Sequence, residues 1–380
     1  MKYHELVGAP GGNTAKSPWV TPPSGSNEDL APEPPENLEA AAGQPRAPEG
    51  EEGGKADGEE RGQLADVAAE VLMKVLYAAR MARPDLLAPV SALSRFVTKW
   101  TRDCDRRLAR LMQYIRYSQH WKQVAHVGDD AQSLKIVLFA DADFAGCAET
   151  ARSTTGVFLA IMGANTFVPV AAMSKRQGCV SHSTTEAELV AMDTALRLFG
   201  LPMQTLLQPL LTDDGGAFGA RDGDDTVGAR AYHQVWFAED NQATIRVCRS
   251  GRSPSLRHLA RTHRVSLSWL YEVFQRGDVK LGYIVTTSQA ADIFTKPIAN
   301  ATKWEAACRL LGVVRRGGEA EGREVISECY VELEKSHEEG GFAAVPTGHG
   351  ARLTPGANPA KGDQGAEGRK GDERTKRCCS

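Results

Sequence analysis

The sequence predicts a mixed α/β fold in which a five-stranded sheet carries helices on its faces. Three observations lead to this prediction. An unbroken apolar run at 136–140 has the length and composition of a strand that is buried on both faces. Two more apolar runs follow it with a glycine turn between them, which is typical of an antiparallel meander. Farther along, helical patterns alternate with two short apolar runs, so we expect helices to connect the remaining strands.

The predicted elements follow one another at short spacing. Their order is strand 136–140, strand 153–163, strand 165–174, a helix from 184, strand 235–240, helices at 241–249 and 264–277, strand 279–285 and a last helical segment at 289–294. The helix from 184 has the best-marked start, because Ser183 and Glu186 have the spacing of a capping box. Pro202 is expected to kink or end that helix.

Composition divides the 380 residues into four parts. Residues 1–62 and 314–380 contain few large apolar side chains and are rich in residues such as Gly and Glu, so we expect both tails to be disordered. Residues 63–126 carry amphipathic helical patterns. Residues 131–313 form the predicted α/β domain, in which the acidic, Gly-rich stretch 212–231 is expected to be a loop insertion.

The net charge of −3 gives no overall signal for nucleic-acid binding, but the local distribution of charge does. No acidic residue occurs between Asn241 and Trp269, whereas basic and histidine side chains accumulate there. They are Arg246, Arg249, Arg252, Arg257, His258, Arg261, His263 and Arg264. A solvated helix face is the simpler interpretation from charge alone. Beside a cluster of carboxylates, however, such a strip suits phosphate groups.

The eight cysteines form no CxxC pair and have no histidine at the spacing of zinc ligands. The sequence also shows no signal peptide and no apolar run long enough to cross a bilayer. We therefore expect a reduced intracellular protein, in the cytoplasm or nucleus, with no structural zinc and no membrane partner.

Four acidic residues lie at the junctions of predicted elements: Asp141, Glu188, Asp240 and Asp292. Each aspartate has a simpler interpretation. Asp141 is then a turn residue, Asp240 a helix cap and Asp292 an acid near a helix start. Glu188 aligns with the buried stripe of its helix, whereas Glu186 aligns with the more polar face. If the four carboxylates meet, they repel one another, and a pair of Mg²⁺ ions would relieve that repulsion.

Several stretches in this order resemble one known family. They are ARPDLLAPVSALSRF, FADADFAGCAETARSTTGVFLAIMG, SHSTTEAELVAM, EDNQATI, RTHRVSLSWLYE and SQAADIFTKPI. Residues 83–312 resemble the C-terminal part of the copia-type LTR-retrotransposon polyprotein, which is its ribonuclease H domain preceded by the end of its reverse transcriptase region. The resemblance implies a ribonuclease H-like sheet and hydrolysis of the RNA strand of RNA–DNA hybrids. It also implies two Mg²⁺ ions, or Mn²⁺ in their place, held by the catalytic residues Asp141, Glu188, Asp240 and Asp292.

Further expectations concern the surroundings of this site. Arg257, His258, Arg261 and His263 are predicted to contact phosphates of the nucleic acid. Asp143 is an expected accessory acid, or an alternative ligand should Asp141 point away. Glu239 departs from the family pattern, because a cysteine usually stands there, and it adds a negative charge beside the site.

Two other functions stay open. One is a catalytically inactive or domesticated retroelement remnant that binds nucleic acid. The other is a transposase or integrase, which would need a His/Cys zinc module and a differently spaced acidic triad that the sequence does not show. Polymerase activity is not expected of this chain alone, so a separate reverse transcriptase polymerase acting in trans is a candidate partner.

Overall fold

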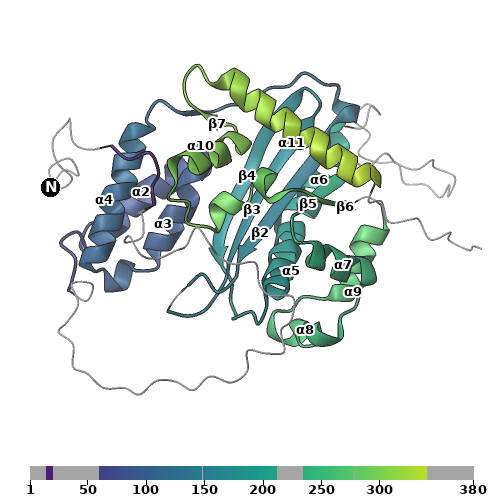
Figure 1. The fold of residues 1–380 in the computed structure, drawn as a ribbon, viewed down its shortest axis with the longest axis horizontal. Helices are drawn as coiled ribbons and strands as arrows, with labels where there is room; N and C mark the ends of the chain where they lie inside the picture. The colour runs from purple at the N-terminus through teal and green to yellow at the C-terminus, as the bar shows by residue number, and fades with distance from the viewer. Residues whose placement is uncertain (1–13, 20–59, 148, 212–233, 278, 340–380) are drawn as a thin grey trace, which may run out of the picture. The chain divides into compact units, whose positions relative to one another are not determined.

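The computed structural model describes residues 14–19, 60–147, 149–211, 234–277 and 279–339 (Figure 1). Most of the expected N-terminal tail and all of the expected acidic insertion therefore lie outside the described residues. Among the helices of the described part, none combines the length and the apolar character that a membrane span requires.

The predicted five-stranded mixed sheet is confirmed. Its strands are β2 (Lys135–Asp143), β3 (Thr154–Gly163), β4 (Thr166–Arg176), β5 (Val235–Glu239) and β6 (Val279–Tyr283), in the order β4-β3-β2-β5-β6. The first three strands form the expected antiparallel meander. Strand β5 runs parallel to β2 and to β6 on either side of it. The carboxyl ends of β2 and β5 therefore lie next to each other at one edge of the sheet.

Strand β2 is buried on both faces, as its apolar run predicts. Val137 and Phe139 belong to one hydrophobic core, and Ile136, Leu138 and Ala140 belong to a second core on the opposite face. This division follows from the alternation of side chains along a strand. An interior strand with two packed faces holds the residues at its end in fixed positions.

The second core is formed with helices that follow the meander and β5. They are α5 (Thr184–Ala195), α6 (Leu201–Leu211), α7 (Gln242–Ser250), α8 (Leu259–Thr262) and α9 (Leu267–Gln275). The expected break at Pro202 takes another form, because a π-helical turn at Leu196–Gly200 joins α5 to α6. Pro202 is the second residue of α6, and the helix changes its hydrogen-bond pattern in the π-helical turn just before it.

The upstream helical segment shares the first core with the sheet. It contains α2 (Ala68–Met81), α3 (Leu87–Ser94) and α4 (Arg102–Tyr117), which pack in the same cluster as α10 (Ala301–Leu310). The two-residue strands β1 (Lys122–Gln123) and β7 (Val313–Val314) pair antiparallel and join the start of the domain to its end.

The predicted disorder of residues 314–380 is wrong for its first part, because Glu319–Glu339 form helix α11. Figure 1 shows α11 crossing one face of the sheet. Tyr330 and His337 stack on Trp236 of β5, with ring centroids 5.6 and 4.8 Å apart. The low average hydrophobicity of this segment concealed a narrow apolar stripe, which is enough for a helix that packs by one face. The buried members of the stripe are Ile326, Cys329, Tyr330 and Leu333.

A buried ion pair stabilises the helical segment. The guanidinium of Arg83 donates to both carboxylate oxygens of Asp85, at 2.9 and 2.7 Å, and the Tyr114 hydroxyl donates to Asp85 Oδ2 at 2.7 Å. Asp85 is fully buried. We expect Asp85→Asn to lower the free energy of unfolding by about 3 kcal/mol, since it leaves a buried guanidinium without its counter-charge. Urea unfolding measures this loss.

The matched control is Asp103→Asn on the exposed side of α4, where Asp103 pairs with Arg106 and Arg107. Exposed pairs contribute about 0–1 kcal/mol, so this variant should unfold close to the wild type. Equal losses for the two variants would contradict the assignment.

Candidate active site

The carboxyl ends of β2 and β5 present two aspartates at the same edge of the sheet. Asp141 lies near the end of β2 and is buried, and Asp240 directly follows β5. Asp240 does not cap the next helix, because the Asn241 side chain does so by accepting hydrogen bonds from the N–H groups of Ala243 and Thr244. The carboxylate of Asp240 is therefore available to the site.

Gln289 links the two strands just behind these aspartates. Its side-chain Nε2 donates to the carbonyl oxygens of Ala140 and Ala238, at 3.1 and 3.5 Å. The residue is buried. This amide thus fixes the separation of the strand ends that carry Asp141 and Asp240.

The third aspartate comes from the segment after β6. The predicted helix at 289–294 is wrong in extent, since only Asp292–Phe294 form one 3₁₀ turn. This turn still places Asp292 beside Asp141. Thr295 donates a hydrogen bond to Asp141 Oδ2, and Lys296 Nζ lies 2.7 Å from Asp292 Oδ1 and 3.3 Å from Asp141 Oδ1.

The acidic residues form two overlapping sets. Asp141, Asp240 and Asp292 each offer an oxygen within 4.8 Å of the others, and so do Glu188, Glu239 and Asp240. Asp240 belongs to both sets. The structure therefore brings together all four residues that the sequence predicted as ligands, and it adds Glu239.

Burial makes this cluster electrostatically unfavourable without a cation. Burial and the negative charges of Asp141, Glu239 and Asp240 raise the pKa of Glu188 well above its ordinary value. Burial and the charge of Asp240 do the same to the pKa of Glu239. Burial, with the charge of Asp141, raises the pKa of Asp292 to about 8 and also raises that of Asp240.

Lys296 neutralises part of this charge. Burial disfavours its ammonium form, but the attraction of Asp141, Asp292 and Asp240 outweighs burial and raises the pKa of Lys296. The side chain is 41% exposed, so it reaches the cluster from the solvent side.

Two carboxylate oxygens have no partner in the described part of the chain. They are Oε2 of Glu188 and Oε2 of Glu239, and both are buried. A buried carboxylate oxygen without a partner is costly. An all-oxygen set with two such atoms suits a hard divalent cation, so the residues present fit the ions that the family resemblance implies.

Asp143 belongs to neither acidic set. Its Oδ1 accepts a hydrogen bond from the Thr154 backbone N–H on the neighbouring strand. Burial raises the pKa of Asp143 to about 6, and the negative charge of Asp141 contributes. Because Asp141 points into the cluster, Asp143 is not needed there as an alternative ligand.

The capping box at the start of α5 is present but differs in detail from the expectation. Ser183 Oγ accepts from the Glu186 N–H at 3.1 Å, and Glu186 Oε2 accepts from the His182 N–H at 3.0 Å. The prediction that Glu186 lies on a more polar face is wrong, because the residue is fully buried. His258 and His263 cover it, with Nε2 atoms 3.2 and 2.8 Å from Glu186 Oε1.

The predicted phosphate contacts therefore divide into two groups. Arg257 and Arg261 are exposed, whereas His258 and His263 turn toward Glu186. Arg261 and His263 also line a groove of about 510 Å³ that reaches β3, β4 and α5. Its other polar and charged lining residues include Thr155, Lys175, Arg176, Gln177 and Arg264.

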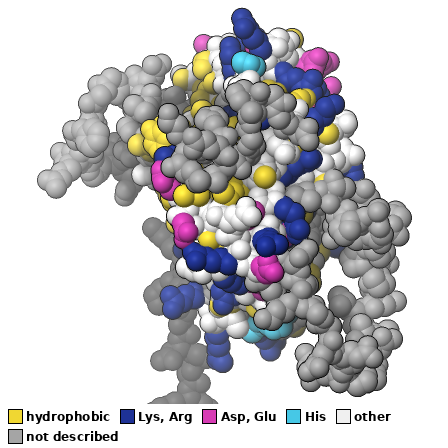
Figure 2. Space-filling model, turned by 90° about the vertical axis from the view of Figure 1, so that its left-hand side faces the viewer, with side chains coloured by type: hydrophobic (Ala, Val, Ile, Leu, Met, Phe, Trp, Pro, Cys, Tyr) yellow, Lys and Arg dark blue, Asp and Glu magenta, His cyan; other side chains and the backbone are white. Residues whose placement is uncertain are grey.

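On the face seen in Figure 2, Lys and Arg side chains are interspersed with Asp and Glu. The groove gathers four basic side chains, those of Lys175, Arg176, Arg261 and Arg264.

Sequence reasoning did not assign a role to Lys296 or Gln289, and it treated Glu239 only as an added charge. Lys296 lies four residues after Asp292, and this spacing was a usable signal for an ion pair. Gln289 had no signal, because its hydrogen bonds join strands that are far apart in the sequence.

The chain resembles several known proteins. Secreted RxLR effector protein 161 of Plasmopara viticola is 33% identical over 121 residues, which cover 32% of this chain and 80% of that protein. The Retrovirus-related Pol polyprotein from transposon TNT 1-94 of Nicotiana tabacum is 26% identical over 259 residues, or 67% of this chain and 17% of the polyprotein. Uncharacterized mitochondrial protein AtMg00810 of Arabidopsis thaliana is 31% identical over 112 residues, or 30% of this chain and 44% of that protein.

No family model matches the chain, and no solved structure matches it. The strand order and the acidic cluster define the class, which is a ribonuclease H-like mixed sheet. The chain belongs to the same family as the Plasmopara viticola protein. The chain is distantly similar to a copia-type Pol polyprotein over 67% of its length. This similarity confirms that the chain is a region related to retroelement Pol. The chain spans less than half of the tobacco polyprotein and of the Arabidopsis protein.

Proposed function

We propose that this chain is a divalent-metal-dependent endonuclease that hydrolyses the RNA strand of RNA–DNA hybrids. The observation that carries the proposal is the meeting of Asp141, Glu188, Asp240 and Asp292, together with Glu239, at the ends of two parallel strands. Similarity to a retroelement Pol polyprotein supports nucleic acid as the substrate class. An intracellular location and a polymerase partner in trans belong to the same proposal.

The residues have separate roles in this proposal. Asp141, Asp240 and Asp292 would hold one Mg²⁺, and Glu188, Glu239 and Asp240 would hold a second, with Mn²⁺ as a substitute. Bound in pairs, such ions lower the pKa of an attacking water and stabilise charge on the departing oxygen. Gln289 keeps the two strand ends in register, and Thr295 orients Asp141.

In this proposal the groove lined by residues of β3, β4 and α5 and by 261–264 binds the substrate. Lys175, Arg176, Arg261 and Arg264 would neutralise phosphates, and the hydroxyl of Thr155 and the amide of Gln177 offer polar contacts. Discrimination for RNA would come from contacts to 2′-hydroxyl groups in the wide minor groove of the hybrid.

The test is cleavage of an end-labelled RNA–DNA hybrid by the full chain in the presence of Mg²⁺. We expect cutting of the RNA strand of the hybrid, little cutting of DNA duplex, and no cutting when EDTA removes the cation. Absence of cleavage with both Mg²⁺ and Mn²⁺ would reject the enzymatic proposal.

A second candidate function is nucleic-acid binding without catalysis, as in an inactive or domesticated remnant. The position of Lys296 favours it, because its ammonium group already lies within ion-pair distance of Asp141 and Asp292. Hybrid binding that persists without any cleavage would identify this case.

The basic groove yields a prediction for binding. Arg261→Ala removes one phosphate-neutralising charge, so we expect weaker hybrid binding and a salt-dependence slope reduced by about one. Fluorescence anisotropy at several salt concentrations measures both. Arg80→Ala on α2 is the matched control, because Arg80 is exposed and does not line the groove. Unchanged slopes for both variants would contradict a role for Arg261.

A further inference from the structure

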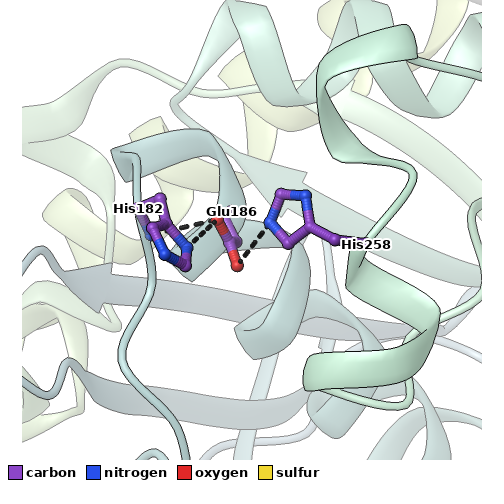
Figure 3. Close-up of side chains that lie close together, drawn as sticks. All are labelled: His182, Glu186 and His258. Carbon is purple, nitrogen blue, oxygen red and sulfur yellow. Dashed lines mark hydrogen bonds and ion pairs between the residues drawn. The ribbon is translucent and has the colours of Figure 1, made fainter.

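A second cluster of potential metal ligands lies outside the acidic site, at the start of α5. It contains His182 from the loop before α5, Glu186 from the first turn of α5, and His258 and His263, which flank α8. Figure 3 shows the rings of His182 and His258 approaching the carboxylate of Glu186 from opposite sides. The ligand atoms of His182, Glu186 and His258 all lie within 4.8 Å of one another.

The distances in this cluster suit a shared cation. His182 Nδ1 lies 3.4 Å from Glu186 Oε2, and His258 Nε2 lies 3.2 Å from Glu186 Oε1. The His258 contact is a hydrogen bond at the long end of the normal range, the His182 contact is longer than that range, and the two rings approach different oxygens of Glu186. Ligands at about 2.0–2.1 Å from a tetrahedral ion are separated from one another by roughly 3.3–3.4 Å. The observed separations are close to that value.

A buried histidine provides an independent observation. The side chain of His263 is only 2% exposed, and its Nε2 lies 2.8 Å from Glu186 Oε1. Nevertheless this nitrogen makes no hydrogen bond of suitable geometry to any described residue. The distance is short enough for a hydrogen bond, so the orientation of the ring excludes one, and this buried imidazole nitrogen lies beside the carboxylate without a hydrogen bond to a described residue.

The carboxylate of Glu186 is surrounded by nitrogen atoms. The His182 N–H donates to it at 3.0 Å, and the Nε2 atoms of His258 and His263 lie 3.2 and 2.8 Å from its Oε1. The same carboxylate holds the cap of α5 through its Oε2 atom, so its position is fixed by the helix start.

We propose that His182, Glu186 and His258 form a binding site for a divalent transition-metal ion of the zinc class, with His263 packed beside the Glu186 carboxylate. Imidazole nitrogens with one carboxylate are the ligands that such ions prefer, whereas Mg²⁺ prefers the all-oxygen cluster. The site would link the start of α5 to the segment at 254–264, which carries Arg257 and Arg261. It differs from the zinc module considered from the sequence, because its ligands come from two segments more than seventy residues apart.

The test uses the full chain after removal of metals, titrated with Co²⁺ in excess Mg²⁺ so that the acidic cluster is occupied. We expect one equivalent of Co²⁺ to give the intense visible absorption of a four-coordinate nitrogen–oxygen site, and Zn²⁺ to displace it. Thiolate charge-transfer bands in the near ultraviolet would instead report binding by cysteines. A wild-type protein without the visible band would overturn the proposal.

Variants separate this site from any other. The double variant His182→Ala/His258→Ala should lose the band, whereas His120→Ala, at an exposed histidine of the α4–β1 connection, should keep it. His182→Ala alone changes a side chain that is 72% exposed, so its fold should be intact, and we expect its Co²⁺ affinity to fall at least about tenfold. Zn²⁺ should raise the melting temperature of the wild type and of His120→Ala but not of the double variant. Equal Co²⁺ binding by His182→Ala and wild type would contradict the site.

Discussion

Asp141→Asn should slow cleavage of RNA–DNA hybrids roughly a hundredfold while leaving hybrid binding intact. Asp141 contacts Thr295 and Lys296 and shares a ligand set with Asp240 and Asp292, so an amide there removes a charged ligand from the centre of the site. A catalytic cation contributes several kcal/mol to the stabilisation of the transition state, and a loss of about 3 kcal/mol corresponds to roughly a hundredfold in rate. Single-turnover cleavage with Mg²⁺ measures the effect.

The matched control is Asp130→Asn, in the exposed loop before β2. Asp130 is the same residue type and lies outside both ligand sets, so this variant should cut at the wild-type rate. Hybrid binding by Asp141→Asn should equal or slightly exceed that of the wild type, because the variant repels phosphates less. If Asp141→Asn and the wild type cut equally well, the assignment of the cluster is wrong.

Glu239→Gln should make the metal-free protein more stable at pH 8. Glu239 is fully buried, its Oε2 has no partner among the described residues, and burial with the charge of Asp240 raises its pKa. Replacing it with a neutral amide relieves the repulsion, so we expect the free energy of unfolding to increase, by an amount on the order of 1 kcal/mol. Chemical unfolding in EDTA measures the gain. Mg²⁺ should stabilise this variant less than the wild type.

The sign of the pH dependence follows from the raised pKa values. Asp292 has a pKa of about 8 in the folded protein against 3.8 ordinarily, so the folded protein keeps a proton that the unfolded chain releases. The free energy of unfolding of the metal-free protein should therefore fall as the pH rises from about 4 to about 8. Glu239→Gln should reduce this fall, and added Mg²⁺ should oppose it.

Glu272→Gln on α9 is the control, because Glu272 is exposed and outside the cluster. It should reproduce the wild-type pH dependence. A wild-type stability that rises between pH 4 and pH 8 in EDTA, or a Glu239→Gln protein less stable than wild type at pH 8, would show that the cluster is not under charge repulsion.

Much of the sheet could be predicted because each strand carries its own local signal. The apolar run of β2, the glycine turn between β3 and β4 and the capping box at Ser183 all act within a few residues. Helix α11 escaped prediction because its apolar side chains form a narrow stripe within a highly charged segment. Its packing depends on the aromatic ring of Trp236, which lies about ninety residues earlier.

Asp141 and Asp240 of the candidate site could be predicted, because each is an acidic residue at the end of a strand. Helical geometry correctly placed Glu188 and Glu186 on different sides, since Glu188 joins the acidic cluster and Glu186 joins the histidines, but it did not predict that both are buried. The environment of Glu186 was not predictable, since the histidines that cover it come from a different segment. Contacts of this kind are determined by tertiary packing and leave no periodic pattern in the sequence.

The core that α2, α3, α4 and α10 share with the sheet has a practical consequence. A shortened protein starting at residue 131 would retain every acidic residue of the site but would lose α2, α3 and α4, which share a core with Phe294 and Trp304 and supply the Tyr114 ring that contacts Trp304. The bared aromatic surface would favour aggregation. An inactive preparation of such a fragment would then report a solubility failure rather than a missing activity.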